Sequence, residues 1–310
     1  MNIQNILVVS PMYKVLQPLI EKEQIEKNFR FLPEEKLSTD QLVWSDALVC
    51  FNLKTNVDYS QVKWVHSLGA GVDRFLYGKS WDQKVLLTRT VCSFGQRIAE
   101  YCLSYILKDL QFHDQFRHAK VHKKWEPMTP KLISDQKVMI YGTGEIGQKT
   151  AEIFSVLGVE VFGVSLSGKA KESFKEVMTL ESHYSRLSEM DYIINTLPLT
   201  GKTANLFSAE IFGLLSNAGF INVGRGATLD EGALLEALNK QYVRFAVLDV
   251  FNQEPLPEEN PLWVHPNVQI TPHISAVTTP EEGVACFVET LKNIDENKPL
   301  RNKVDVEKGY

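Results

Sequence analysis

The chain alternates short apolar runs with longer stretches in which apolar residues recur at helical spacing. In the first part of the chain, runs typical of buried strands occur at ILVVS (6–10), FRFLP (29–33), ALVCF (47–51), WVHSLG (64–69) and LLTRT (86–90). Helical patterns separate several of these runs. Because strands that alternate with helices are typical of a parallel sheet covered by helices, this part predicts an α/β unit.

A long amphipathic segment follows, and then the alternation begins again. Between Phe94 and His118, apolar residues recur on one face, which predicts a single helix that connects two units. The next strand-like runs are KVMIYG (137–142), VEVFGVS (159–165), YIINTLP (192–198), GFINVG (219–224), RFAVLDV (244–250) and VQITP (268–272). Further helices are predicted at Ile146–Leu157, Ala209–Leu215, Glu231–Asn239 and Pro280–Asn293. We therefore expect an α/β fold with two Rossmann-like or flavodoxin-like domains, each with a parallel sheet.

Composition and charge narrow the function classes. The 310 residues, of which 44% are hydrophobic and 23% charged, are enough for two globular domains of ordinary size. The formal net charge of −5 argues against a surface that follows nucleic-acid phosphates, so we expect no nucleic-acid partner. One basic run, RHAKVHKKW (117–125), opposes this average, and an exposed helix face or loop is favoured there over an anion site.

The spacing of the cysteines and the length of the apolar runs indicate the cellular compartment of the protein. Cys50, Cys92, Cys102 and Cys286 stand apart, without CxxC spacing or accompanying histidine ligands, so we expect free thiols and no metal site. Cys50 and Cys102 lie in apolar runs, which predicts small buried side chains. The N-terminal run is too short for the core of a signal peptide, and no run approaches the about 18 apolar residues of a membrane span. We expect a cytoplasmic protein without a membrane partner.

A glycine-rich turn opens the second alternation. In KVMIYGTGEIGQKTAEIF, Gly142, Gly144 and Gly147 form G-x-G-x-x-G between a strand and an amphipathic helix, the context that a dinucleotide-binding turn requires. The first glycine permits the tight turn, the second lets the backbone approach a pyrophosphate, and the third allows close packing of helix on sheet. A dinucleotide site with the helix amides facing the anion is favoured over a purely structural turn. The candidate contacts are Gly142, Thr143, Gly144, Glu145, Ile146 and Gly147.

The residues after the next strand bear on the choice between NAD and NADP. A carboxylate there would bind the ribose 2′-hydroxyl of NAD, but the segment SLSGKAK (165–171) contains no acid. The hydroxyls of Ser165 and Ser167, with the ammonium of Lys169, could instead bind a 2′-phosphate. This favours NADP(H), although an ordinary polar turn is the alternative and NAD(H) stays possible.

Three polar residues follow strands of the second unit, at the sheet edge where parallel sheets bind their ligands. Arg225 comes directly after GFINVG, Glu254 follows the next strand within NQEPLP, and His273 follows VQITP. Arg225 offers a planar fork for a carboxylate. Glu254 beside His273 would favour the imidazolium, which could protonate a carbonyl oxygen while hydride arrives from a nicotinamide. Each residue alone has an ordinary structural explanation, but their coincidence at one edge favours catalysis.

At these residues the chain resembles the D-2-hydroxyacid dehydrogenase family, and within it the glyoxylate/hydroxypyruvate reductase branch. The similarity runs from SLGAGVD through NVGRGATLDEGALLEAL, LDVFNQEPLPEENPLW and TPHISA to the terminal VDVEKGY. The resemblance implies that Arg225 binds substrate, that Glu254 pairs with His273, and that His273 donates the proton. It implies further cofactor contacts at Leu197, Pro198, Val223, Gly224 and Asp249, the last on the nicotinamide carboxamide.

The resemblance also assigns roles to the two units. The backbone N–H groups of Ala70 and Gly71 would bind the substrate carboxylate, with an ordinary helix start as the local alternative. Residues 1–97 with 275–310 would form the substrate domain and residues 98–274 the dinucleotide-binding domain, with the active site in the interdomain cleft. The expected partners are a small 2-keto or 2-hydroxy acid and a second copy of the chain, because members of this family usually form dimers.

Several alternatives stay open. Leu166 stands where NADP-preferring relatives commonly carry an arginine, which weakens the case for a 2′-phosphate and leaves Lys169 as the main cation. A bulkier 2-keto acid is the alternative substrate, with Phe51 and Trp263 as candidate pocket residues. A non-catalytic protein that senses the dinucleotide is the alternative function, and the intact set of arginine, glutamate and histidine argues against it. A methyltransferase is disfavoured because it would have no use for this set.

Overall fold

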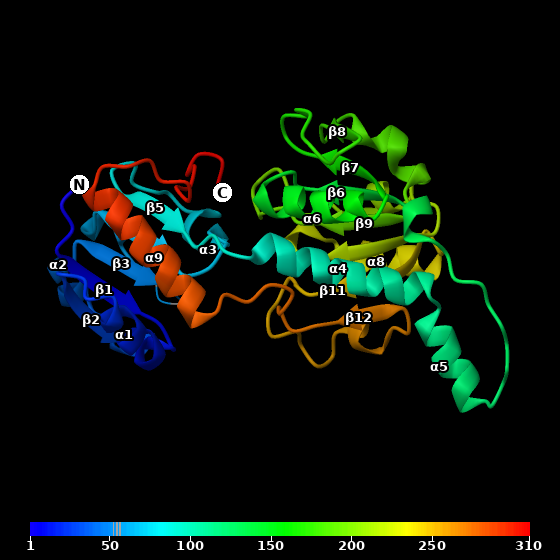
Figure 1. Ribbon diagram of the computed structural model, residues 1–310, viewed down its shortest axis with the longest axis horizontal. Coiled ribbons are helices and arrows are strands. Elements are labelled where there is room, and N and C mark those ends of the chain that lie inside the picture. Colours follow the sequence, from blue (N-terminus) through cyan, green and yellow to red (C-terminus); the bar gives the residue numbers. More distant parts are fainter. Residues whose placement is uncertain (52, 54, 56) are drawn as a thin grey trace. The chain divides into compact units, whose positions relative to one another are not determined.

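The computed structural model describes residues 1–51, 53, 55 and 57–310. The chain divides into two compact units, of which the first contains Met1–Phe94 and Thr278–Tyr310 and the second contains Gly95–Val277. The first unit is therefore discontinuous, because the end of the chain returns to it (Figure 1). Within the described residues, no helix combines the length and the apolar character needed to cross a membrane.

The first unit is built on a five-stranded parallel sheet. Its strands are β1 (Asn5–Val9), β2 (Asn28–Leu32), β3 (Ala47–Cys50), β4 (Trp64–Ser67) and β5 (Leu86–Arg89). Their spatial order β2-β1-β3-β4-β5 is that of flavodoxin-like sheets. The helices are α1 (Tyr13–Lys22), α2 (Thr39–Trp44), α3 (Asp73–Leu76) and the C-terminal α9 (Pro280–Asp295). Each strand begins within one residue of the apolar run that predicts it and ends at most two residues before that run does, so these five predictions are confirmed.

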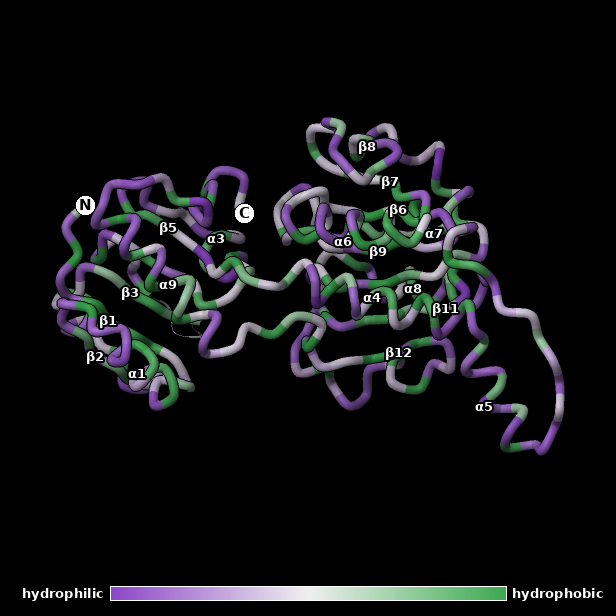
Figure 2. Tube along the Cα trace, in the orientation of Figure 1, coloured by the Kyte–Doolittle hydropathy of each residue, from purple (hydrophilic) through white to green (hydrophobic). Residues whose placement is uncertain are grey.

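The strands of this sheet are buried on both faces. Along β1, Ile6 and Val8 point into a core with α1 and α9, whereas Leu7 and Val9 point into the core on the other face. This two-sided burial explains why the strands consist of continuous apolar runs rather than of alternating polar and apolar residues. Figure 2 shows the apolar residues concentrated along the strands of each unit.

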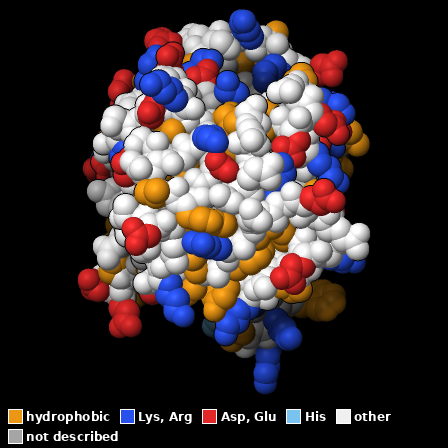
Figure 3. All heavy atoms as spheres, turned by 90° about the vertical axis from the view of Figure 1, so that its left-hand side faces the viewer, with side chains coloured by type: hydrophobic (Ala, Val, Ile, Leu, Met, Phe, Trp, Pro, Cys, Tyr) orange, Lys and Arg blue, Asp and Glu red, His pale blue; other side chains and the backbone are white. Residues whose placement is uncertain are grey.

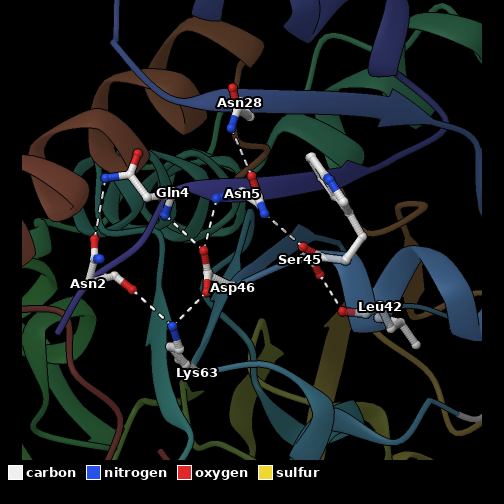
Figure 4. Close-up of polar contacts among 9 residues, drawn as sticks. Asn2, Gln4, Asn5, Asn28, Leu42, Ser45, Asp46 and Lys63 are labelled. Atoms are coloured by element: carbon white, nitrogen blue, oxygen red, sulfur yellow. Dashed lines mark hydrogen bonds and ion pairs between the residues drawn. The ribbon is translucent and has the colours of Figure 1, made fainter.

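Asp46 joins three strands at the amino end of the first sheet (Figure 4). Its Oδ2 accepts the N–H groups of Gln4 and Asn5 at 2.9 and 3.0 Å, and its Oδ1 accepts from Nζ of Lys63 at 2.6 Å. Burial works to raise the pKa of the Asp46 carboxyl, but the bond from Lys63 and those from the two amides outweigh it, so this pKa lies below its ordinary value. The network lies opposite the carboxyl ends of the strands, where ligands bind, and we interpret it as structural.

The second unit is built on a seven-stranded parallel sheet. Its strands are β6 (Lys137–Tyr141), β7 (Glu160–Val164), β8 (Glu176–Met178), β9 (Tyr192–Asn195), β10 (Ala218–Asn222), β11 (Val243–Leu248) and β12 (Val268–Ile270). The order β12-β11-β10-β9-β6-β7-β8 reverses direction between β6 and β9, as in dinucleotide-binding Rossmann sheets. The helices between strands are α6 (Glu145–Val156), α7 (Ala209–Phe212) and α8 (Glu231–Asn239). The two sheets confirm the predicted fold class.

The prediction of one helix over Phe94–His118 is wrong. The structure has α4 (Phe94–Leu110) and α5 (His113–Val121), separated by Phe112 in the left-handed conformation with a φ of +55°. The segment contains neither proline nor a glycine near the break, so the sequence carries no ordinary stop signal there. α4 packs its apolar face on the second sheet, whereas α5 extends away from that sheet (Figure 1).

Smaller features also differ from, or agree with, the sequence patterns. α7 ends before Gly213, three residues earlier than predicted, and the edge strand β8 was not predicted because three residues are too few for a periodic pattern. Cys50 and Cys102 are fully buried, as predicted.

Charged side chains of both signs are interspersed on the face of the first unit that Figure 3 shows, with apolar side chains gathered below its centre.

Candidate active site

The glycine-rich turn connects β6 to α6. Gly142 has a φ of +98°, which side chains rarely allow, and an ideal Cβ on Gly147 would lie 1.8 Å from the carbonyl oxygen of Gly142. An ideal Cβ on Gly144 would meet no atom within 4 Å, so this position borders open space. A tight turn, a close helix–sheet contact and an open approach to the helix amides fit the pyrophosphate of a dinucleotide.

The other residues of the turn have different surroundings. Thr143 is buried, and an ideal Cβ on Gly163 of β7 would lie 2.7 Å from its methyl group. Glu145 is exposed in the first turn of α6, and Ile146 packs on the core beneath this helix. The backbone of Thr143 is therefore fixed beside β7, the strand whose end would face the cofactor ribose.

The turn after β7 presents hydroxyl groups. Oγ of Ser165 accepts the N–H of Gly168 at 3.2 Å, and Oγ of Ser167 accepts the N–H of Lys169 at 3.4 Å. Each hydroxyl keeps its own proton for donation to an anion. The side chain of Lys169 is exposed.

A buried network of amides, which the sequence analysis did not single out, shapes the loops after β9 and β10. Nδ2 of Asn195 donates to Oδ1 of Asn222 at 2.9 Å and to Oγ1 of Thr228 at 2.8 Å, and all three side chains are fully buried. Oδ1 of Asn195 accepts the N–H of Leu197, and Oδ1 of Asn222 accepts the N–H of Gly224. A signal was present, because two otherwise apolar strands each end in asparagine.

The network holds the predicted cofactor contacts at the sheet edge. Leu197 and Val223 are buried, and the carbonyl oxygen of Pro198 accepts from Oγ1 of Thr203 at 2.6 Å. An ideal Cβ on Gly224 would lie 2.7 Å from the carbonyl oxygen of Leu197. This glycine is needed for contact between two loops of the protein itself.

Arg225 follows β10 and is partly buried. Its Nη1 donates to the carbonyl oxygen of Gly224 at 2.7 Å. Gly226 follows Arg225 in the chain. An ideal Cβ on Gly226 would lie 1.9 Å from the carbonyl carbon of Phe251, so only glycine fits there. This close approach places the Arg225 turn against the segment that leads to Glu254.

His273 and Glu254 form a hydrogen-bonded pair. Nδ1 of His273 lies 2.9 Å from Oε2 of Glu254, and Oε1 of Glu254 accepts the N–H of Phe251 at 3.0 Å. The His273 side chain is 49% exposed, so its Nε2 can face a ligand while Nδ1 is held. The φ of His273 is +54°, in the left-handed region that residues with a side chain adopt infrequently.

The electrostatics of Glu254 connect the three predicted catalytic residues. Burial works to raise the pKa of the Glu254 carboxyl, but hydrogen bonds from His273 and from the Phe251 amide outweigh it. The charges of His273 and Arg225 act in the same direction, so this pKa lies below its ordinary value. The structure therefore brings arginine, glutamate and histidine together around one ionised carboxylate.

Asp249 positions the turn that carries His273. Its Oδ1 accepts from Oγ1 of Thr271 at 2.6 Å and from the N–H of Ile274 at 2.8 Å, and its Oδ2 accepts the N–H of Ser275 at 2.9 Å. The side chain is fully buried. These three bonds hold the Asp249 carboxylate against the segment Thr271–Ser275, and its predicted contact with the nicotinamide carboxamide stays a prediction.

The remaining predicted residues have separate environments. In the first unit, Ala70 and Gly71 lie in the bend between β4 and α3, and their N–H groups have no hydrogen-bond acceptor within the described residues. The ring of Phe51 covers the neighbouring Gly69, at 3.0 Å from its ideal Cβ. In the second unit, Nε1 of Trp263 donates to the carbonyl oxygen of Pro257. No group of three metal-ligating side chains occurs in the part of the chain that the structure describes.

The site can be compared with known proteins. Residues 103–275 match the model of the D-isomer specific 2-hydroxyacid dehydrogenase NAD-binding domain. The chain belongs to the D-isomer-specific 2-hydroxyacid dehydrogenase family. As a member of this family it is an NAD(P)-dependent oxidoreductase. The matched region contains the glycine-rich turn together with Arg225, Glu254 and His273.

Relatives in this family include reductases and cofactor complexes. A glyoxylate/hydroxypyruvate reductase A from Klebsiella pneumoniae is 32% identical over 261 residues, which cover 80% of this chain and 82% of the relative. A D-isomer-specific 2-hydroxyacid dehydrogenase from Xanthobacter autotrophicus, solved with NADPH and MES, has a TM-score of 0.89 at 26% identity and full coverage of both chains. An NADPH-dependent glyoxylate/hydroxypyruvate reductase from Sinorhizobium meliloti, solved with NADP and sulfate, has a TM-score of 0.86 at 26% identity, with 99% and 100% coverage.

Proposed function

We propose that the chain is an NAD(P)H-dependent reductase of small 2-keto acids, such as glyoxylate and hydroxypyruvate, that forms the D-2-hydroxy acid. The observation that carries this proposal is the 2.9 Å contact between Nδ1 of His273 and Oε2 of Glu254, with the charge of Arg225 acting on the same carboxylate. A proton donor and a carboxylate-binding group at one sheet edge suit a keto acid. The reductases among the relatives support this substrate class.

In this mechanism the chain binds the substrate and supplies the proton, and the bound nicotinamide supplies the hydride. The guanidinium of Arg225 binds the substrate carboxylate. In the first unit, the amides of Ala70 and Gly71 are candidate donors to a carboxylate. Glu254 holds the ring of His273 through Nδ1, so that Nε2 can protonate the keto oxygen.

NADP(H) is the favoured cofactor, and NAD(H) is the alternative. The absence of an acid from residues 165–171, the two serine hydroxyls there, and the NADPH and NADP complexes of the neighbouring structures support this preference. We propose that the unit formed by Gly95–Val277 binds the cofactor and that the other unit contributes to substrate binding. The free cysteines support a cytoplasmic location.

A His273→Asn variant tests the proposed reaction. Wild-type protein should oxidise NADPH when glyoxylate or hydroxypyruvate is added, and the variant should lose about 10²- to 10⁴-fold in kcat because the general acid is gone. Its dissociation constant for NADPH should stay within about twofold of wild type, because the asparagine does not alter the glycine turn. Undiminished turnover by the variant would contradict the proposal. A wild-type protein that binds NADPH but reduces no 2-keto acid would favour the dinucleotide sensor.

We further propose that the chain forms a homodimer through the second unit. Val121 at the end of α5, Trp125 and Leu132 are large apolar side chains that are 73%, 98% and 65% exposed. Such a group on an extended segment is typical of a protein contact. A second copy is the expected partner from the family resemblance. Light scattering during gel filtration should report a dimer for wild type and a monomer for a Val121→Asp/Trp125→Asp double variant. The control Val156→Asp changes a side chain of α6 that is 82% exposed, and this variant should stay dimeric.

A further inference from the structure

Lys171, which the sequence analysis did not single out, reaches back to the glycine-rich turn. Its Nζ donates to the carbonyl oxygen of Thr143 at 2.5 Å, across 28 residues of sequence. Thr143 stands between Gly142 and Gly144, and Gly144 borders open space. The ammonium therefore lies at the edge of the space that the turn leaves open for a cofactor.

The same ammonium belongs to the segment that follows β7. Oγ of Ser165 and Oγ of Ser167 are both held by backbone amides of this segment, which fixes the hydroxyls in place. Gly168 allows the segment to fold back, with a φ of +61°. Two hydroxyl donors and one ammonium are thus connected by a short, internally bonded loop beside Thr143. The loop contains no carboxylate up to Lys171.

We propose that Lys171 is the cation that binds the 2′-phosphate of NADP(H) and so selects this cofactor over NAD(H). An ammonium has three donors, and one of them is used on Thr143. The other two are available for a phosphate monoester, which carries about −1.5 to −2 charges at neutral pH and accepts strong charge-assisted bonds. Lys171 would then bridge the 2′-phosphate to the turn that binds the pyrophosphate. This inference rests on the proposed use of NADP(H).

Lys169 is the competing cation. Both lysines are exposed, but the ammonium of Lys169 has no hydrogen-bond partner within the described residues, so phosphate binding would have to immobilise the whole of this side chain. That ordering has an entropic cost. The ammonium of Lys171 is already held at the turn by its bond to Thr143, so phosphate binding restricts this side chain less.

Binding of cofactor fragments by the full-length protein tests the proposal without catalysis. Calorimetric titration would compare adenosine 2′,5′-bisphosphate, which carries the 2′-phosphate, with adenosine 5′-monophosphate, which lacks it. Lys171→Gln should weaken binding of the bisphosphate by about tenfold or more and change binding of the monophosphate by less than about twofold. Lys171→Arg should retain most of the bisphosphate affinity. The matched control, Lys169→Gln, should change it by less than about threefold.

Two results would overturn the proposal. Equal weakening of both ligands by Lys171→Gln would show that the lysine only supports the glycine turn. A larger loss for Lys169→Gln than for Lys171→Gln would transfer the role to Lys169. Thermal unfolding of each variant checks that the fold is intact. Because the readout is binding, a protein that binds the bisphosphate through Lys171 but reduces no keto acid would refute the proposed function alone.

Discussion

At the scale of single residues, the two oxygens of Glu254 have different partners. Oε1 is held by the amide of Phe251, which fixes the carboxylate, while Oε2 faces Nδ1 of His273. The pKa of this carboxyl lies below its ordinary value, so the group is ionised at neutral pH. Oε2 therefore carries negative charge 2.9 Å from Nδ1 of His273. The pair is therefore suited to keep a proton available to a keto oxygen.

A Glu254→Gln variant should reduce glyoxylate more slowly. The neutral amide can still bond Nδ1 of His273, but it removes the negative charge beside the ring, so kcat/KM should fall by about tenfold or more. Measurement of kcat/KM for glyoxylate at pH 7.5 checks this. Asp230→Asn, which changes an exposed carboxylate that caps α8, is the matched control and should leave kcat/KM unchanged. A kcat/KM for Glu254→Gln within about twofold of wild type would contradict the role given to this charge.

The residues around Glu254 could be predicted because strand ends are readable from the apolar pattern. Arg225, Glu254 and His273 each follow an apolar run, and parallel strands bring such residues to one edge. Asn195 and Lys171 were missed for different reasons. Asn195 acts through buried bonds to other loops, and Lys171 acts through a contact 28 residues away, which no local pattern encodes.

At the scale of secondary-structure elements, the apolar pattern predicts most strands and helices but not how they pack against one another. The strands were predicted because each is a continuous apolar run, and α9 was predicted from its period and from the proline that begins it. The break at Phe112 was not, because neither proline nor a nearby glycine marks the end of α4. Nor could patterning show that Trp64 of β4 stacks on Phe287 of α9, with centroids 5.7 Å apart and His66 beside them.

His66 should make the first unit sensitive to acid. Its ring is fully buried, and burial lowers its pKa from 6.5 to about 3. The unfolded chain therefore takes up a proton below about pH 6.5 that the folded chain does not, so stability falls as pH decreases from 6.5 toward 3. Between pH 7.5 and 5 this residue should contribute a loss of about 2 kcal/mol in the free energy of unfolding.

Urea unfolding at pH 7.5 and pH 5 measures this effect. His66→Gln should lose about 2 kcal/mol of the pH-dependent difference, whatever its stability at pH 7.5, because glutamine does not titrate. His183 of the second unit, whose pKa is also lowered by burial, should keep its own contribution in this variant. The control His113→Gln removes an exposed histidine on α5 and should keep the wild-type difference. Asp46 does not interfere, because its lowered pKa places its effect at more acidic pH. A His66→Gln protein with the wild-type difference would contradict the assignment.

At the scale of the whole molecule, the chain builds its first unit from two distant segments. Every residue of the glycine turn and of the group around Glu254 lies in Gly95–Val277, whereas α9 belongs to the core of the unit that contains β1–β5. The proposed cofactor-binding turn and the proposed proton donor are thus encoded in one continuous stretch. The core of the other unit contains residues that follow this stretch in the sequence.

Removal of residues 278–310 should therefore unfold the first unit and leave the second folded. α9 buries five apolar side chains in that core: Val284, Phe287, Val288, Leu291 and Ile294. At about 1.5–3 kcal/mol each, their loss amounts to about 7–15 kcal/mol, which equals or exceeds the whole stability of an ordinary domain. Hydrogen exchange should show the amides of β1 and β3 unprotected and those of β6 and β9 protected.

The truncated chain should still bind NADPH but should not reduce glyoxylate, whereas removal of Lys308–Tyr310 alone should preserve both properties. Protected amides in β1 of the truncated chain would show that the first sheet folds without α9.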